Sequence, residues 1–171
     1  MLADLSGRLL ARLDTNDRYS DPGLSSADAD PGLIPKNTRT ALRRKLRAAQ
    51  SLHDAELDEW FGCFITEPKP WLAPAPPRRK LTPAQLRKRL AASGKLQRDP
   101  AALLAWYNAG PATGVKLYAN GQCHTLRLTG LARMLCAVRS YPAAQLESWR
   151  QDPQAVGLLT ALCNAGILHF K

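Results

Sequence analysis

The segment that decides the fold is Val-Lys-Leu-Tyr-Ala-Asn-Gly-Gln-Cys-His-Thr-Leu, residues 115–126. At its centre, Asn120-Gly121 is a favoured pair for a type I′ turn, because both turn positions need a positive φ. The flanking segments 115–119 and 122–126 have strand character. We therefore predict a β-hairpin with a two-residue turn. That turn length fixes the register, which pairs Leu117 with His124 and Val115 with Leu126.

A helix with a complete start signal precedes the hairpin. Thr82 is placed to cap it, Pro83 takes the first helical position, and Gln85 completes a capping box. Leu86 and Leu90 follow at helical spacing, which predicts that they face the core. The cations between them are predicted to face solvent, namely Arg87, Lys88 and Arg89. A left-handed glycine is predicted to end this helix at Gly94.

Three more helices are predicted after the hairpin. The first begins near Thr129, the second covers 142–150, and the third has Asp152 as its cap and Pro153 at its first position. Gly166 ends the third helix. The residues predicted to face inward are Leu131, Leu135 and Val138, then Leu146 and Trp149, then Val156, Leu159, Leu162 and Cys163.

The order of these elements indicates an α+β, mostly helical fold of winged-helix type over residues 81–171. A short strand at 167–170 closes the sequence, and we expect it to return to the sheet of the hairpin. Residues 101–108 have two readings: their alanines and leucines favour a helix, whereas Trp106 and Tyr107 favour a strand.

The N-terminal part, residues 1–67, is predicted to be a helical region that mediates dimerisation. Helices are expected at 2–13 and 37–51, separated by an irregular stretch at 14–35 with two Asp-Pro-Gly turns. A third helix begins at Asp54 and carries a wide apolar face. Helices this short cannot close a large core of their own, so this face should pair with another copy or another domain. The predicted dimerisation residues are Leu42, Leu46, Leu57, Trp60 and Phe61.

The charge of the chain is divided unevenly. Its net charge is +10, but residues 1–67 have 9 basic and 11 acidic side chains, whereas residues 68–171 have 15 and 3, a net charge of +12. A basic half implies either an acidic partner such as nucleic acid or merely a cationic, solvated surface. A proline-rich, basic linker is predicted at 68–80. The candidate nucleic-acid contacts are Arg78, Arg79, Lys80, Arg87, Lys88 and Arg89, with Arg127, Arg133 and Arg139 as a second set.

The residues that metal or nucleophilic chemistry needs are sparse. The three histidines are His53, His124 and His169, and none begins an HxD or HxE pair, so the facial triad of a non-haem iron oxygenase is missing. A dyad of Cys123 with His124 or His169, assembled by the fold, is disfavoured; Cys123 and His124 in particular are neighbours on a strand and point to opposite faces. Phosphate-loop, GxSxG and HExxH motifs are absent. We therefore assign no catalytic, cofactor-binding or metal-binding residue.

The cysteines, the apolar runs and the first residues indicate in which cellular compartment the protein is found. Four cysteines are too far apart for CxxC chemistry and sit in apolar or strand-like sequence, which predicts buried, reduced thiols in a reducing cytoplasm. No apolar run approaches the roughly 20 residues of a transmembrane helix. The first residues carry Asp4 where a secretory signal is basic, so we expect neither export nor membrane association.

Two N-terminal motifs and most of the remaining chain resemble a known family. Trp-Phe-Gly-Cys-Phe-Ile-Thr-Glu-Pro-Lys-Pro at 60–70, and Arg-Tyr-Ser-Asp-Pro at 18–22 with Pro-Gly-Leu-Ile-Pro at 31–35, resemble the region after the Jumonji-type cupin barrel of bacterial ribosomal oxygenases. The sequence from the basic linker through Tyr-Ala-Asn-Gly at 118–121 to Leu-Thr-Ala-Leu-Cys-Asn-Ala-Gly at 159–166 is similar to the C-terminal winged-helix domain of that family.

This resemblance implies a separate role for each part of such a protein. In the family, the helical region after the barrel mediates dimerisation and the winged helix is an accessory domain. The barrel binds Fe(II) and 2-oxoglutarate and hydroxylates an arginine of a large-subunit ribosomal protein. No position of this sequence matches the ligands in the barrel, so the resemblance implies a non-catalytic, cytoplasmic part of such an oxygenase and a homodimer. The alternative is a small basic winged-helix protein that binds nucleic acid.

Overall fold

The computed structural model describes residues 3, 5–7, 39–40, 43–44, 47, 54–92 and 94–171. The chain divides into two compact units, Met1–Leu57 and Asp58–Lys171. The helices predicted at 2–13 and 37–51 lie largely outside the described residues, and the stretch 14–35 lies wholly outside them. Leu42 and Leu46 also lie outside them. The second unit therefore carries most of the structural argument.

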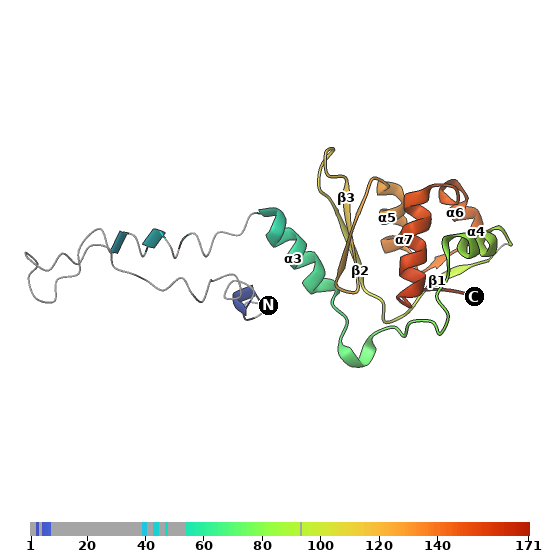
Figure 1. The fold of residues 1–171 in the computed structure, drawn as a ribbon, viewed down its shortest axis with the longest axis horizontal. Helices are drawn as coiled ribbons and strands as arrows, with labels where there is room; N and C mark the ends of the chain where they lie inside the picture. The colour runs from blue at the N-terminus through green and yellow to red at the C-terminus, as the bar shows by residue number, and fades with distance from the viewer. Residues whose placement is uncertain are drawn as a thin grey trace, which may run out of the picture. The chain divides into compact units, whose positions relative to one another are not determined.

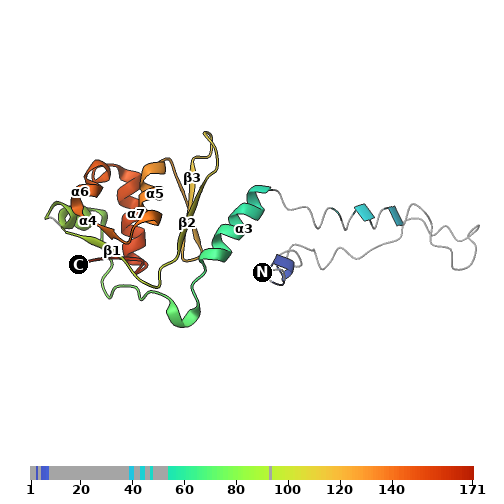
Figure 2. The ribbon, with the colours of Figure 1, turned by 180° about the vertical axis from the view of Figure 1, so that it is seen from behind.

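Helices and short strands alternate along the second unit (Figures 1 and 2). They begin with a helix that crosses the unit boundary. In chain order the elements are α3 (Asp54–Thr66), η1 (Pro70–Leu72), α4 (Pro83–Ala91), β1 (Leu96–Arg98), β2 (Leu104–Asn108), β3 (Val115–Ala119), β4 (Gln122–Leu126), α5 (Thr129–Ala137), β5 (Ser140–Tyr141), α6 (Ala143–Leu146), η2 (Glu147–Trp149), α7 (Pro153–Asn164) and β6 (Leu168–Phe170). The predicted α+β class is confirmed.

The predicted hairpin is confirmed in turn type and register. Asn120 and Gly121 have φ values of 47° and 80°, as a type I′ turn requires. β3 pairs with β4 so that Leu117 lies opposite His124 and Val115 opposite Leu126. β2 adds a third antiparallel strand on the other side of β3. Of the two structures predicted for residues 101–108, helix or strand, the strand is therefore correct, and it covers Leu104–Asn108.

A second antiparallel sheet has the order β5–β1–β6. The expectation that the last strand joins the hairpin was wrong, because β6 pairs with β1 through Gln97 and His169. β1 and β5 are three and two residues long and went unpredicted. Strands this short have too few positions to show an alternating pattern.

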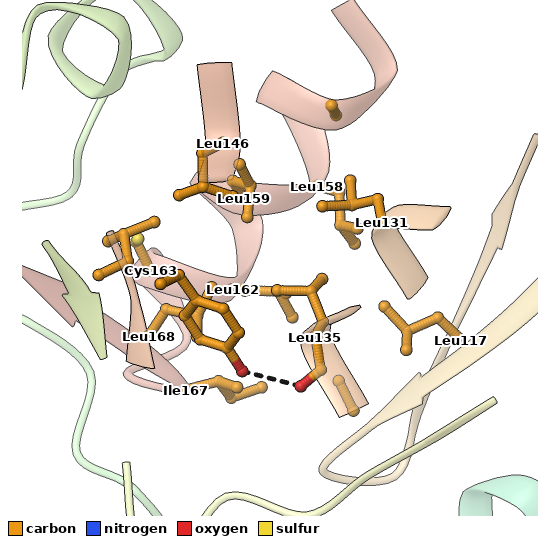
Figure 3. Packing of buried hydrophobic residues seen from close by; sticks show 14 of the residues in the cluster. Leu117, Leu131, Leu135, Leu146, Leu158, Leu159, Leu162, Cys163, Ile167 and Leu168 are labelled. Carbon is orange, nitrogen blue, oxygen red and sulfur yellow. Dashed lines mark hydrogen bonds between the residues drawn. The ribbon is translucent and has the colours of Figure 1, made fainter. Parts of the chain in front are cut away.

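The core lies between the helices and both sheets (Figure 3). α5 packs against β2 and β3, while α7 packs against α4 and β6. The Tyr141 hydroxyl donates to the carbonyl oxygen of Leu135 at 2.8 Å, which ties β5 to α5. Fully buried leucines from most elements fill the space: Leu86, Leu96, Leu117, Leu131, Leu135, Leu146, Leu159, Leu162 and Leu168.

Helix ends follow the local signals closely. The Thr82 and Gln85 capping box is formed in both directions, and Asp152 Oδ1 accepts hydrogen bonds from the backbone of Gln154 and Ala155. Gly166 ends α7 with φ at 77°. Ile167 N–H donates to Leu162 C=O, which completes a Schellman motif.

Four details of the helices differ from the prediction. Gly94 does not have a positive φ; it is needed because a Cβ there would lie 2.7 Å from the carbonyl oxygen of Arg89. Val138 is 40% exposed because α5 ends at Ala137. Arg87 is half-buried rather than solvent-facing. The helix predicted over 142–150 is a short α6 followed by a 3₁₀ turn.

Candidate interaction surface beside α3

The C-terminal turn of α3 is bound to the hairpin through one buried hydroxyl. Thr66 is only 2% exposed. Its Oγ1 donates to the Gly62 carbonyl oxygen at 2.8 Å and accepts from the N–H of Gly121 at 3.1 Å. Thr66 therefore provides the hydrogen-bond acceptor for the backbone N–H of Gly121 in the type I′ turn.

A glycine in the middle of α3 allows close packing on the sheet. A Cβ on Gly62 would run into the ring of Tyr118, which is 1% exposed on β3. Glycine in a helix interior costs about 1 kcal/mol relative to alanine, so its presence here has a packing reason. α3 also contacts β3 through Lys116 Nζ and Glu59 Oε2, 3.0 Å apart. That hydrogen bond raises the pKa of Lys116.

We expect Thr66→Val to lower the free energy of unfolding by about 1–3 kcal/mol, because it leaves the part-buried Gly121 N–H without its partner at nearly constant side-chain shape. Chemical denaturation followed by circular dichroism measures the change. Thr66→Ser is the matched control: it keeps the hydroxyl and should retain most of the stability. Equal losses in both variants would contradict this role for the hydroxyl.

Two large apolar side chains of α3 remain exposed in the second unit. Phe61 and Ile65, one turn apart, are 47% and 46% exposed. Leu57, one turn earlier on the same helix, is 38% exposed. Trp60 is 8% exposed instead, and its ring stacks on Phe64 with centroids 5.4 Å apart. Of the predicted dimerisation residues that are described, Leu57 and Phe61 are thus accessible and Trp60 is not.

An aromatic groove of about 380 Å³ adjoins Phe61 and Ile65. Its opposite wall is formed by Trp106 and Tyr107 of β2 and by Tyr118 of β3, and Asp58 is its one acidic lining residue. The rings of Tyr107 and Tyr118 stack at 6.1 Å. We name Phe61, Ile65 and this groove the α3 surface. The sequence did not identify β2 as part of it, although its adjacent Trp106 and Tyr107 were the available signal.

The predicted nucleic-acid contacts occupy two consecutive segments. Arg78, Arg79 and Lys80 are all exposed in the stretch before α4, and Lys88 and Arg89 are exposed on α4 itself. The guanidinium of Arg89 lies 5.4 Å from the centre of the Phe170 ring. In the second set, Arg133 lies 5.7 Å from the Trp106 ring and Arg139 donates to the Pro100 carbonyl oxygen.

The described residues do not fit a Fe(II) site. Nowhere within them do three His, Cys, Asp or Glu side chains gather closely enough to hold a metal ion. Burial lowers the pKa of His124, and it raises the thiol pKa of Cys136 to about 11 and of Cys163 to about 12. Such thiols stay protonated at neutral pH and are weak ligands and nucleophiles. Cys163 is buried as predicted, whereas Cys63, Cys123 and Cys136 are only half-buried.

In the part of the chain that the structure describes, no helix combines the length and apolar character that crossing a membrane requires.

Helices α4, α5, α6 and α7, the sheet that contains the hairpin and a second short sheet that receives the last strand make this unit a winged-helix module. The chain belongs to the ROXA-like winged helix family, whose model matches residues 45–169.

Solved structures with the same fold come from a ribosomal oxygenase. Two structures of Escherichia coli YcfD, a ribosomal oxygenase, match at 23% sequence identity, with TM-scores of 0.71 and 0.72, covering 99% of this chain and 45% of that one. The YcfD complex with cobalt and 2-oxoglutarate matches equally well, at a TM-score of 0.71. The chain thus spans less than half the length of these proteins. Comparison with curated proteins found no significant match.

Proposed function

We propose that this chain is the dimerisation and winged-helix portion of a bacterial Fe(II)- and 2-oxoglutarate-dependent ribosomal oxygenase. The family match over residues 45–169 carries the proposal, and the shared fold with YcfD supports it. In this view residues 1–67 form the dimerisation region, 68–80 a linker and 81–171 the winged helix. The protein works in the cytoplasm.

In this proposal the chemistry belongs to a cupin barrel that these 171 residues do not include. The barrel would hold Fe(II) and 2-oxoglutarate and would hydroxylate an arginine of a large-subunit ribosomal protein. The structure of YcfD in complex with cobalt and 2-oxoglutarate supports a metal ion used together with 2-oxoglutarate. The intact mass of the native polypeptide tests the arrangement: a mass above 18.8 kDa by about one domain is expected. A native mass of 18.8 kDa would require the barrel to come from another chain.

The contribution of this chain is to join two copies through α3. Phe61 and Ile65 expose large apolar side chains beside an aromatic groove, and exposed apolar clusters of this kind mark interaction sites. In a two-fold dimer the same patch meets itself, so one helix face can fill the groove of the other copy. Trp60 would contribute indirectly, because its buried ring stacks on Phe64 and so supports this face of the helix.

We expect the 171-residue chain to sediment as a dimer of twice 18.8 kDa at micromolar concentration. Phe61→Asp with Ile65→Asp should convert it to a monomer and weaken association at least 100-fold, because each charge would be buried in an apolar contact. Analytical ultracentrifugation across a dilution series measures this change.

The matched control is Leu103→Asp with Val138→Asp. These side chains are 43% and 40% exposed and lie outside the α3 surface. The control should remain dimeric. A wild-type monomer at tens of micromolar, or equal dissociation of both double variants, would reject dimerisation through α3 and would leave the family membership untouched.

A further inference from the structure

Trp71 is the most exposed large apolar side chain in the described part of the second unit. It lies in η1, shortly after α3, and is 77% exposed. The N–H of Leu72 donates to the carbonyl oxygen of Lys69 at 2.8 Å, which closes this turn, and Lys69 Nζ lies 5.9 Å from the centre of the indole ring. A side chain whose position is restricted in this way loses less conformational entropy when a partner covers it.

Trp71 lines neither of the two grooves that flank α3 and η1. Its neighbour Leu72 lines the second groove, of about 480 Å³, together with Leu103, and the first is the aromatic groove of the α3 surface. Figures 1 and 2 both show η1, in bright green, beyond the C-terminal end of α3. Tryptophan is among the residue types most enriched at the positions that dominate protein–protein binding. The indole is therefore available to another copy of the chain.

The aromatic groove has the size and the chemistry to accept an indole. Its volume of about 380 Å³ exceeds that of one indole ring, and the stacked rings of Tyr107 and Tyr118 form part of its wall. Asp58, which is exposed, is its one acidic lining residue. The rings offer stacking partners to an indole, and the carboxylate of Asp58 offers an anion to the ammonium group of Lys69 that accompanies the indole.

The area that a stable dimer buries also calls for more than the helix face. Stable interfaces bury on the order of 800 Å² of each copy. A fully buried aromatic side chain contributes about 150–250 Å², so Phe61, at 47% exposed, supplies roughly 100 Å². By the same reasoning Trp71 supplies roughly 190 Å², more than any other exposed apolar side chain of this unit. An interface that includes Phe61 and Ile65 therefore gains most by including Trp71.

Two-fold symmetry brings η1 of one copy towards the Asp58 end of the groove in the other. If α3 packs against its own copy across a two-fold axis that crosses the helix, the two helices run antiparallel. A helix rises about 1.5 Å per residue, so Asp58 and Ile65 are roughly 10 Å apart along α3. The segment that follows the C-terminal end of one α3 then lies beside the N-terminal half of the other, where Asp58 is found.

Resting on the proposed dimer, we propose that Trp71 of each copy inserts into the aromatic groove of the other copy. Its indole stacks between the groove's aromatic side chains, and Lys69 pairs with Asp58 across the interface. The contact is reciprocal, so each dimer contains two of them. Each groove is complete only when the second copy supplies its tryptophan.

Analytical ultracentrifugation of the full 171-residue chain across a dilution series tests the contribution of Trp71. Trp71→Ala should weaken association at least roughly 30-fold, because two interface tryptophans are lost from each dimer. The matched control is Leu72→Ala, on the same turn and 54% exposed, whose side chain lines the other groove. The control should associate within about 3-fold of wild type. Both side chains are exposed, and circular dichroism should show unchanged folding in both variants.

A mixing experiment tests whether Trp71 and the groove meet between copies. Trp71→Ala lacks the indole but keeps the groove, whereas Ala105→Trp keeps Trp71 and fills its own groove from β2. Each variant alone should associate weakly. A heterodimer of the two retains one complete contact, so an equimolar mixture should associate about 5-fold more tightly than either variant alone.

Weakening by Trp71→Ala, near-wild-type association of Leu72→Ala and recovery in the mixture would together establish the contact. Association of Trp71→Ala as tight as that of wild type, or equal losses in the Trp71 and Leu72 variants, overturns the role of Trp71 and leaves dimerisation through α3 standing. Weakening without recovery in the mixture overturns insertion into the groove of the other copy. A wild-type monomer at tens of micromolar overturns both this contact and the dimer on which it rests.

Discussion

Gly166→Ala is expected to lower the free energy of unfolding by about 2–4 kcal/mol, the sum of a conformational and a steric cost. Gly166 has φ at 77°, a region that L-residues occupy at a cost of roughly 1–2 kcal/mol. A Cβ there would also run into the carbonyl oxygen of Ala75. The linker would have to move away from the end of α7, where Asn164 holds it by two hydrogen bonds to the backbone of Leu81.

The same substitution at Gly157 should have the opposite sign. Gly157 lies inside α7, and a Cβ there would meet nothing within 4 Å. Alanine is favoured over glycine in a helix interior by about 1 kcal/mol, so Gly157→Ala should stabilise the protein by that order. Urea denaturation of both variants measures the pair. A destabilisation of equal size in both would contradict the assigned role of the left-handed glycine.

Features with a strong local signal could be predicted from the sequence. The Asn120-Gly121 turn, the Thr82 capping box and the Asp152 cap each depend on a few neighbouring residues, and all three form as expected. Side chains within hydrogen-bond reach of their own backbone determine such features. The core positions on α4 and α7 followed from helical spacing, because residues three or four apart share one face of a helix.

Features that depend on distant partners could not be predicted. β1 and β5 are too short to show alternation, and β6 pairs with β1, whose residues lie 70 to 74 positions earlier in the chain. Gly94 was assigned to a left-handed cap, whereas its requirement comes from close approach to a carbonyl oxygen. A Cβ there would also lie 3.0 Å from the Phe170 ring, a neighbour that only the tertiary arrangement supplies.

Of the α3 surface, the sequence indicated the apolar face of the helix but not the wall that β2 contributes. The apolar spacing of α3 indicated a face in need of a partner, and Phe61 and Ile65 are exposed. The opposing wall from β2 could not be foreseen, because residues 101–108 fitted a helix as well as a strand. Trp60 was assigned to the outer face, but its stacking on Phe64 and its burial belong to the packing of the helix itself.

Leu135→Ala should lower the free energy of unfolding by about 2–5 kcal/mol, because it removes buried methyl groups and leaves a cavity. Leu135 is 0% exposed on α5 and lies among leucines of other elements in Figure 3.

The backbone carbonyl of Leu135 makes this position more sensitive. It accepts from the Tyr141 hydroxyl at 2.8 Å and from Arg98 Nη1 at 3.1 Å, so relaxation of α5 into the cavity would strain both links to the sheet of β5 and β1. We therefore expect incomplete relaxation and a cost in the upper part of that range. Leu103→Ala, at a side chain 43% exposed, is the control and should change stability by less than about 0.5 kcal/mol. A loss below about 1 kcal/mol for Leu135→Ala in chemical denaturation would mean that the core collapses freely around α5.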